Sequence, residues 1–585
     1  MRRSNHSSPD RFVAVALLAL AAGALLDNPP AAARAADVDF ETSPTRIVYD
    51  GQADDLLTAG LDQQGLLVAP APPDATRLAA FAERRRRAIH QNWRGLADLT
   101  TPIESPRIAG VEFFGVLAAR RGLPASGFLL QIPSSFDPRR PCLLVTAASG
   151  SRGVYGSLPT VGQWGLRRGC AVVTDDKALG MRIIDRTASL QISAEGAPQT
   201  LPATADTRVP FPYALEMAHA HSSPPSEPLW GRLLLRAGGV ALRILSSEYP
   251  DAPPFTPART LIIAAGISNG GGAVLQALEA DRGLFFDGAV ASEPNVLVAG
   301  APTLYEYATL HALLQPCAVL AEDLARIPLG GIIAAGAARH RAWCTQLATD
   351  GLVTGADIDA QAADARQRLL KSGIAPAALR LGAINLQLEL WTAVTATYVQ
   401  SYLRRLPADP ACGISFAATD AAGRPRALSD AERLALFSDG TGIAPTAGIR
   451  IVVSQAGTAP DVAQAMSYAT ARCLRALAPL TETAARRAQL KGRPGARPVI
   501  VLHGGADALV PIAHSSRPYA ARAAAHNPLF RFIEVERGQH FDALLALPGM
   551  RPDHVAMQPV VDRALDDVRR FLEDGGPLPS STVVN

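Results

Sequence analysis

The chain has 585 residues, of which 48% are hydrophobic and 19% are charged. A single hydrophobic core rarely grows past roughly 250–300 residues, so we expect two domains or one large domain with an insertion. The apolar content excludes global disorder, and the formal net charge of +3 is too small to indicate a nucleic-acid partner. The one dense basic run, Arg84 to Arg87, is expected to be the solvated face of a helix.

The first 35 residues have the layout of a secretory signal peptide. Basic residues in MRRSNHSSPDR precede an apolar run at 12–26, and small residues follow at Ala33 and Ala35. The apolar run is shorter than the roughly 20 residues that span a bilayer, and no cysteine follows it to carry a lipid anchor. The sequence therefore predicts a secreted protein, extracellular or periplasmic, that has no membrane attachment after the signal is cleaved.

Short apolar runs that are typical of buried strands recur along the chain. They lie at residues 111–118, 126–133, 141–149, 170–176, 259–268, 287–296, 497–505 and 530–538. Continuous runs rich in β-branched residues suit a sheet that is covered on both faces. Helical patterns follow many of them, for example at 271–283 and 515–527. This alternation predicts an α/β fold with a mostly parallel central sheet.

The strand pattern nearly stops between residues 297 and 498. This stretch is rich in Ala and Leu, and its patterns at 304–327 and 385–406 are those of amphipathic helices, whereas only 449–454 resembles a strand. We interpret it as a large, mainly helical cap inserted into the core. The predicted organisation is a signal peptide at 1–35, a first core part with an N-terminal extension at 36–299, a cap at 300–496 and a second core part at 497–585.

The six cysteines can form disulfides in an oxidising compartment, and fifteen pairings are possible. Cys142 and Cys170 lie in apolar runs, so we expect them to be buried small residues. The other four lie in the predicted cap and can cross-link it internally: Cys317, Cys344, Cys412 and Cys473. No Cys or His cluster has the spacing of metal ligands, so neither a metal nor a cofactor is expected.

Residues 266–270, Gly-Ile-Ser-Asn-Gly, match the G-x-S-x-G nucleophile elbow of α/β-hydrolases. The pattern alone is weak evidence in a chain with 48 glycines, but here a predicted strand precedes it and a predicted helix follows it. Such a turn holds a serine in a strained conformation with its hydroxyl exposed, and the glycines prevent clashes with neighbouring backbone. We predict that Ser268 is a nucleophile in an α/β-hydrolase fold; the alternative is an ordinary glycine-rich turn.

A serine hydroxyl needs a base to take its proton, and in this fold the acid and then the histidine follow the nucleophile along the chain. Asp507 and His540 each lie just after a predicted strand, where open α/β sheets place their sites. We predict that His540 is the general base and that Asp507 orients it. His554 is the alternative base, and His503 is expected to support the turn that carries Asp507.

The tetrahedral intermediate of acyl transfer needs hydrogen-bond donors for its oxyanion. One is expected to be the backbone N–H of Asn269, which directly follows the nucleophile. The second is expected in the loop at 147–156, AASGSRGVYG. Gly150 is our choice there, and Ser149 and Ser151 are the other candidates.

Several segments together resemble the extracellular 3-hydroxybutyrate oligomer hydrolases. They are AASGSRGVYG, QWGLRRGCAVVTDD, GISNGGGAVLQALE, DGAVASEPNV, HSSRPY and QHFDALL. The resemblance extends from about residue 40 to the C-terminus and places Ser268 on the family's nucleophile. It implies an enzyme that cleaves short (R)-3-hydroxybutyrate oligomers to monomers, downstream of the depolymerases that attack the solid polyester. The stretch TDDKALG departs from the glycine-rich sequence expected there.

A serine triad under a helical cap fits the hydrolysis of carboxylic esters. No Ser/Thr-rich linker to a polymer-binding module is evident, which favours a soluble small-molecule oligoester as the substrate. Three other classes remain open: an exported esterase of the tannase and feruloyl-esterase kind, a secreted amidase or peptidase, and a non-catalytic α/β-hydrolase-like binding protein. The sequence does not specify the oligomeric state.

Overall fold

The computed structural model describes residues 40–584, except 69–73, 104–106, 121, 181, 194–195, 204–207, 328, 438–447, 455–458, 461 and 552. The predicted signal peptide lies outside these residues. In this described part of the chain, no helix has both the length and the apolar character that crossing a membrane requires.

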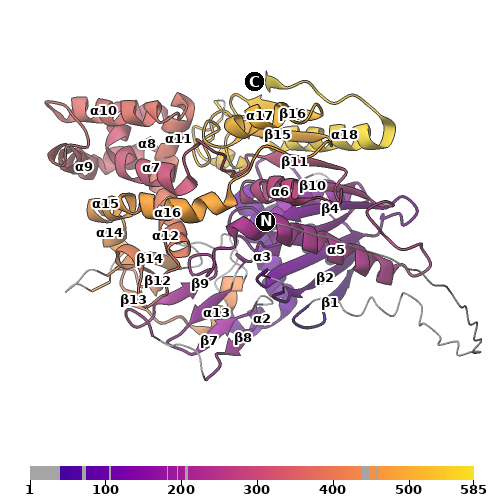
Figure 1. Ribbon diagram of the computed structural model, residues 1–585. Helices are drawn as coiled ribbons and strands as arrows, with labels where there is room; N and C mark the ends of the chain where they lie inside the picture. Colours follow the sequence, from indigo (N-terminus) through magenta and orange to yellow (C-terminus); the bar gives the residue numbers. More distant parts are fainter. Residues whose placement is uncertain are drawn as a thin grey trace, which may run out of the picture. The chain divides into compact units, whose positions relative to one another are not determined.

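A ten-stranded sheet forms the core (Figure 1), in the order β1-β2-β3-β5-β4-β10-β11-β15-β16-β17. Neighbouring strands from β5 to β17 pair in parallel, and β1, β2, β3 and β5 pair antiparallel. The eight apolar runs predicted as buried strands of the core all belong to this sheet, and the α/β-hydrolase fold is confirmed. The strands are β1 (Thr45–Tyr49), β2 (Gly110–Leu117), β3 (Ser126–Pro133), β4 (Cys142–Ala147), β5 (Ala171–Asp175), β10 (Leu261–Ile267), β11 (Gly288–Ser292), β15 (Val499–Gly504), β16 (Phe530–Val535) and β17 (Thr582–Val584).

Helices cover both faces of this sheet. Gly165 in α4 lies against Leu144 of β4, and Gly238 in α5 lies against the next residue, Val145. Successive residues of a strand point to opposite faces, so α4 and α5 lie on opposite sides of β4. The helices of the core and its N-terminal extension are α1 (Gln63–Leu67), α2 (Ala75–Leu78), α3 (Phe81–Leu96), α4 (Gln163–Arg167), α5 (Trp230–Glu248), α6 (Asn269–Ala280), α17 (Ser516–Ala524) and α18 (Gln558–Asp574).

A second, smaller sheet has the order β13-β12-β9-β6-β7-β8, with β14 paired to β12. Its strands come from two distant parts of the chain: one set lies between β5 and α5, and the other lies within the range 300–496. The predicted strand at 449–454 is β14. The bounds are β6 (Ile183–Asp185), β7 (Leu190–Ile192), β8 (Pro198–Thr200), β9 (Leu215–Met217), β12 (Ile414–Thr419), β13 (Pro425–Arg426) and β14 (Ile449–Val453).

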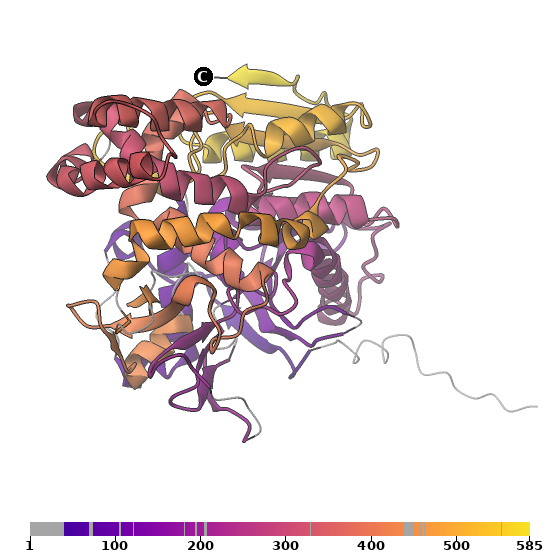
Figure 2. The same ribbon diagram turned by 60° about the vertical axis from the view of Figure 1, so that its left-hand side comes forward.

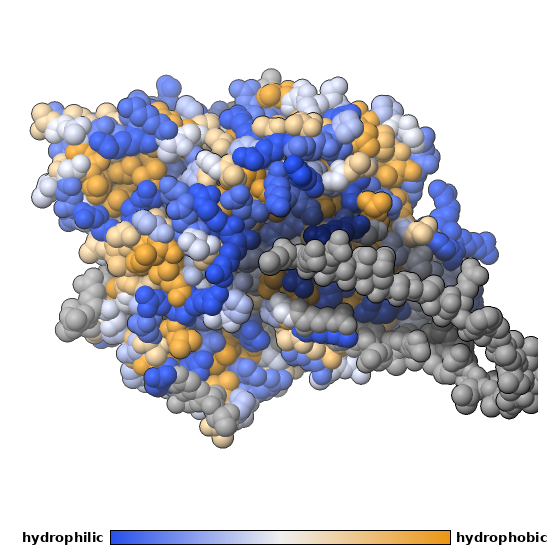
Figure 3. Space-filling view, in the orientation of Figure 1, coloured by the Kyte–Doolittle hydropathy of each residue, from blue (hydrophilic) through white to orange (hydrophobic). Residues whose placement is uncertain are grey.

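The rest of the range 300–496 is built largely of helices, which Figures 1 and 2 show on one side of the ten-stranded sheet. The disulfides Cys317–Cys344 and Cys412–Cys473 cross-link this region internally, as expected. On the face drawn in Figure 3, hydrophobic patches lie between hydrophilic residues. The helices are α7 (Leu304–Ala318), α8 (Gly330–Ala335), α9 (Ala337–Thr349), α10 (Ile358–Lys371), α11 (Pro376–Gln387), α12 (Leu390–Tyr402), α13 (Asp430–Phe437), α14 (Val462–Ala465), α15 (Tyr468–Ala476) and α16 (Ala478–Ala485).

The basic run in α3 is solvated only in part: Arg86 is exposed and Arg87 is half-buried, but the expectation is wrong for Arg84 and Arg85. Arg84 and Arg85 are buried, and the Arg85 side chain is 0% exposed. Its guanidinium lies 3.0 Å from the Glu112 carboxylate in β2 and 4.0 Å from the centre of the Tyr49 ring in β1. A buried charge needs such a partner, and this ion pair ties the N-terminal extension to the sheet.

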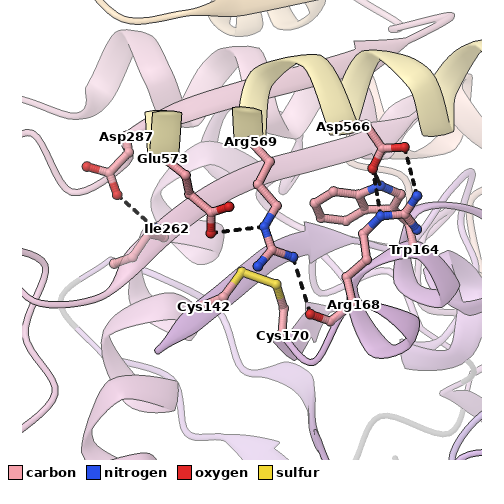
Figure 4. The surroundings of a disulfide bond; sticks show 9 residues. All are labelled: Cys142, Trp164, Arg168, Cys170, Ile262, Asp287, Asp566, Arg569 and Glu573. Carbon is pink, nitrogen blue, oxygen red and sulfur yellow. Dashed lines mark hydrogen bonds and ion pairs between the residues drawn. A yellow bond between two sulfur atoms is a disulfide. The ribbon is translucent and has the colours of Figure 1, made fainter. Parts of the chain in front are cut away.

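A disulfide joins Cys142, the first residue of β4, to Cys170, which precedes β5 (Figure 4). The expected burial of both cysteines is confirmed, but their pairing was not predicted. Close by, Asp566 of α18 accepts hydrogen bonds from Trp164 at 2.9 Å and Arg168 at 2.6 Å. The segment between these two parallel strands is thus linked both to β4 and to α18.

Candidate active site

Ser268 occupies the sharp turn between β10 and α6. Its backbone has φ 59° and ψ −124°, a conformation that side chains with a Cβ rarely adopt. A Cβ on Gly266 would lie 2.5 Å from the Gly270 carbonyl carbon, and one on Gly270 would lie 2.4 Å from the Ala147 carbonyl oxygen. Both glycines of the motif are therefore needed for this turn, which leaves the serine at the N-terminus of α6, where the helix dipole favours negative charge.

The structure brings the three predicted catalytic side chains into one hydrogen-bonded row. Ser268 Oγ lies 3.0 Å from Nε2 of His540, and Nδ1 of His540 lies 2.6 Å from Oδ2 of Asp507. They come from the loops that follow β10, β16 and β15. The alternative base, His554, is not in this row, since its ring hydrogen-bonds the Arg537 backbone.

The carboxyl group of Asp507 is buried and held from several sides. Oδ1 accepts the backbone N–H groups of Leu509 and Val510, each at 2.8 Å. Nε2 of His503 lies 3.2 Å from Oδ2, in agreement with the expected support of this turn. Burial raises the pKa of Asp507, but the charge of His540 and the hydrogen bonds from His503 and His540 outweigh it and hold this pKa well below its ordinary value.

These contacts define the tautomer of His540. An ionised carboxylate only accepts hydrogen bonds, so Nδ1 of His540 donates to Asp507. In the neutral ring Nε2 then carries a lone pair, and this atom faces the Ser268 hydroxyl. The arrangement can remove the serine proton and stabilise the imidazolium that results.

Ser268 opens into a cavity of about 150 Å³. The predicted oxyanion residues Asn269 and Gly150 both line it, and Gly150 has φ +53°, which favours glycine at that position. Most of the other lining side chains are apolar: Leu304, Leu388, Leu390, Ala393, Val394, Leu509, Val510 and Phe541. The polar ones are Ser151, Arg152, Asn295 and Tyr398.

The loop that carries Gly150 is held by residues that sequence reasoning missed. Ser151 Oγ lies 2.6 Å from Nδ1 of His219, which follows β9, and Lys177 donates to the Ala148 carbonyl. Burial and the charge of Lys177 lower the pKa of His219 to about 3, so its ring is neutral. Lys177 lies in the stretch TDDKALG. The departure of this stretch from the family pattern was the only feature of the sequence that drew attention to Lys177.

The cap contacts Asn269, the other predicted oxyanion residue. Its Nδ2 donates to the Tyr398 hydroxyl on α12 at 3.2 Å, and its Oδ1 accepts from Asn295 at 2.9 Å. No motif identifies Tyr398, which lies 129 residues from Asn269 in the chain. Among the described residues, no group of three or more His, Cys, Asp or Glu could hold a metal ion.

Comparison with known proteins covers nearly the whole chain. The family model described as 3HB-oligomer hydrolase (3HBOH) matches residues 21–104 and 101–585. The D-(-)-3-hydroxybutyrate oligomer hydrolase of Paracidovorax citrulli is 34% identical over an alignment of 644 positions, which covers 94% of this chain and 90% of the relative. The protein of the same name from Burkholderia mallei is 34% identical over an alignment of 618 positions, which covers 93% of this chain and 88% of the relative.

Among solved structures, the chain is similar to feruloyl esterase B from Aspergillus oryzae, with 13% identity, a TM-score of 0.37 and coverage of 82% of this chain and 83% of the other. It is also similar to the tannin acyl hydrolase from Aspergillus niger, with 15% identity, a TM-score of 0.36 and coverage of 91% and 83%.

Proposed function

The chain belongs to the 3HB-oligomer hydrolase family, and from this premise we propose that it is an exported serine esterase that hydrolyses dimers and oligomers of (R)-3-hydroxybutyrate to monomers. The observation that carries the proposal is the hydrogen-bonded row Ser268–His540–Asp507, at 3.0 and 2.6 Å, at the wall of a mainly apolar cavity. Such an enzyme acts on the soluble products of poly(3-hydroxybutyrate) degradation.

In the proposed reaction, Ser268 Oγ attacks the ester carbonyl while Nε2 of His540 takes the hydroxyl proton. The backbone N–H groups of Asn269 and Gly150 stabilise the oxyanion of the tetrahedral intermediate. His540 then gives its proton to the departing hydroxyl group of one hydroxybutyrate unit, which leaves an acyl ester on Ser268. Water attacks this ester after losing a proton to His540, and the return of that proton to Ser268 releases the acid.

Two features of the cavity support an ester as the substrate, and the first favours an aliphatic one. The apolar side chains of α12 that line it, Leu390, Ala393 and Val394, can contact the methyl groups that recur along a hydroxybutyrate chain. The N-terminus of α6 lies at the nucleophile, where the helix dipole favours the developing negative charge.

The disulfides support export. All six cysteines are paired, as Cys142–Cys170, Cys317–Cys344 and Cys412–Cys473. Such bonds persist in oxidising compartments and are rare in the cytosol of most organisms. Together with the signal-peptide pattern at 1–35, this favours a periplasmic or extracellular protein. N-terminal sequencing of the protein recovered outside the cytoplasm tests this, and an intact Met1 there would contradict cleavage near residue 35.

Product analysis tests the reaction. The purified protein is incubated with hydroxybutyrate dimer and trimer, and in parallel with esters of gallic and ferulic acid. We expect release of 3-hydroxybutyrate from both oligomers and none from a Ser268→Ala variant, together with labelling of the wild type by a fluorophosphonate. Preferential release of gallate or ferulate would favour the tannase and feruloyl-esterase alternative, and an unlabelled protein without esterase activity would favour a binding protein.

A further inference from the structure

Tyr398 brings a hydroxyl group from the cap to the cavity at Ser268. The residue lies on the face of α12 that also presents Leu390 and Val394 to this cavity, because residues spaced by four lie above one another on a helix. Its hydroxyl is placed by Asn269, another cavity residue, whose Nδ2 donates to it at 3.2 Å. Since Asn269 directly follows the nucleophile in the chain, the Tyr398 hydroxyl lies one side chain away from the reacting serine.

The hydrogen bonds around this hydroxyl run in one direction and end at it. Asn295 Nδ2 donates to Asn269 Oδ1 at 2.9 Å, and Asn269 Nδ2 donates in turn to the Tyr398 oxygen. The hydroxyl hydrogen of Tyr398 has no acceptor among the described residues. Burial raises the pKa of Tyr398, so the hydroxyl keeps this hydrogen at neutral pH. Because a hydroxyl that accepts a hydrogen bond becomes a better donor, the row of side chains ends in a donor that is available to a ligand.

Two neighbouring rings fix the orientation of the Tyr398 ring. His219 makes a T-shaped contact with it, with 4.6 Å between ring centres, and Tyr402 makes another at 5.4 Å. Tyr398 itself is buried. A donor that is already held in place loses little conformational freedom when a ligand arrives. The hydroxyl of Tyr398 is therefore preorganised to recognise one oxygen atom of a substrate.

A hydroxybutyryl ester has one oxygen that suits this donor. The 3-oxygen is the atom that a hydroxybutyryl group has and a butyryl group lacks, and it is attached two carbons from the scissile carbonyl carbon. The backbone N–H of Asn269 is a proposed oxyanion donor, and the side chain of Asn269 holds the Tyr398 hydroxyl, so the 3-oxygen of an ester bound there can reach Tyr398. The carboxylate of the leaving unit is a poorer match, because a charged group in a mainly apolar cavity needs a charged partner. Arg152 is the one cationic side chain among the described residues that line this cavity.

We propose that the Tyr398 hydroxyl donates a hydrogen bond to the 3-oxygen of the acyl unit and thereby selects hydroxyacyl esters over plain fatty acyl esters. The inference rests on the proposed function. The 3-oxygen is a hydroxyl in the dimer and an ester oxygen in longer oligomers, and it has a lone pair to accept with in both. Because the acyl unit stays on Ser268 in the acyl intermediate, the contact persists through both halves of the reaction.

The test removes one oxygen from the substrate and one from the protein. The hydroxybutyrate dimer is compared with the butyryl ester of 3-hydroxybutyrate, which lacks only the 3-oxygen of the acyl unit and releases the same leaving group. We expect the wild type to have a kcat/KM about tenfold higher on the dimer, the effect of one hydrogen bond. In Tyr398→Phe this ratio should fall to about one, because the dimer loses its donor whereas the butyryl ester has no oxygen to lose it from.

Tyr402→Phe is the matched control, because Tyr402 lies on the same helix but donates its hydroxyl to Glu227 and does not line the Ser268 cavity. Its ratio of dimer to butyryl-ester activity should equal that of the wild type. An unchanged ratio in a folded Tyr398→Phe protein, which a purely structural or oxyanion role would give, would overturn the proposal. If melting curves show that this variant does not fold, the wild type carries the test, since equal kcat/KM on the two esters would also overturn it. A wild type that cleaves neither ester would instead overturn the proposed function.

Discussion

Replacing Asp507 with asparagine separates the charge of this side chain from its shape. Two backbone N–H groups, from Leu509 and Val510, donate to Oδ1 at 2.8 Å, and an asparagine amide has only one acceptor oxygen to meet them. These donors hold the amide oxygen on their side, so the NH2 group faces Nδ1 of His540. That nitrogen must then accept, and the ring carries its proton on Nε2, where it faces the Ser268 hydroxyl and cannot take the serine proton.

We expect Asp507→Asn to lower kcat by about 10⁴-fold, the loss seen in another serine hydrolase when the same change traps the wrong tautomer. At 1.36 kcal/mol per tenfold this is ~5 kcal/mol of transition-state stabilisation. The melting temperature should change little, because Oδ1 keeps both backbone donors and Nε2–H of His503, which loses the Asp507 oxygen, still lies 2.8 Å from the Val510 carbonyl. Initial rates on the hydroxybutyrate dimer measure kcat, and thermal melting of the same samples measures folding.

Asp542→Asn is the matched control. Asp542 is also buried, and it accepts the backbone N–H groups of Met557 and Gln558 on its two separate oxygens, at 2.8 and 2.9 Å. An amide cannot accept on both sides, so this variant should lose stability while the folded protein keeps its kcat. If Asp507→Asn retained more than a tenth of the wild-type kcat, the tautomer argument would be refuted. Glu293, buried at the end of β11, would then be the carboxyl to test in a double variant.

Three further outcomes are expected. Ser151→Ala breaks the contact with His219 and frees the loop that carries a proposed oxyanion donor. Steady-state kinetics should therefore show kcat lowered by about tenfold with little change in KM. Cys142→Ser with Cys170→Ser should lower the free energy of unfolding by about 3.6 kcal/mol, as denaturant titration would show, because the bond closes a loop with a sequence separation of 28. Burial raises the pKa of Glu227 to about 7, so folding favours the protonated carboxyl and wild-type stability falls as the pH rises from about 4.5 to about 7. The glutamine of Glu227→Gln does not titrate, so the melting temperature of this variant minus that of the wild type should increase between pH 4.5 and pH 7. If this difference stayed constant, folding would not protonate Glu227.

The central strands could be predicted from the sequence because their signal is local. A strand covered on both faces is a continuous apolar run, as in β4 and β5, where every residue is buried. β1 and β17 escaped prediction because they lie at the two edges of the sheet and most of their residues are exposed. The burial of Arg85 was missed for another reason: its partner Glu112 lies 27 residues away, and helical periodicity carries no information about such a pairing.

The contrast between local signals and long-range contacts also explains which site residues could be predicted. Ser268 stands in a motif that the turn itself requires, and Asp507 and His540 follow strands whose ends meet at one edge of the sheet. His219 and Lys177 have no such local context. His219 contacts Ser151 across 68 residues of sequence, and Lys177 contacts Ala148 across 29, so only the folded chain reveals what they hold.

The contacts of the cap indicate that it does more than cover the nucleophile. Tyr398 on α12 accepts a hydrogen bond from Asn269, on one side of the proposed oxyanion hole. The same ring makes a T-shaped contact with the His219 ring, with 4.6 Å between ring centres, and His219 in turn contacts Ser151. One helix of the cap therefore contacts both segments that carry the proposed oxyanion donors, directly at Asn269 and through His219 at Ser151. Since α12 cannot shift without moving these contacts, we expect the position of the cap to affect the rate at which Ser268 reacts.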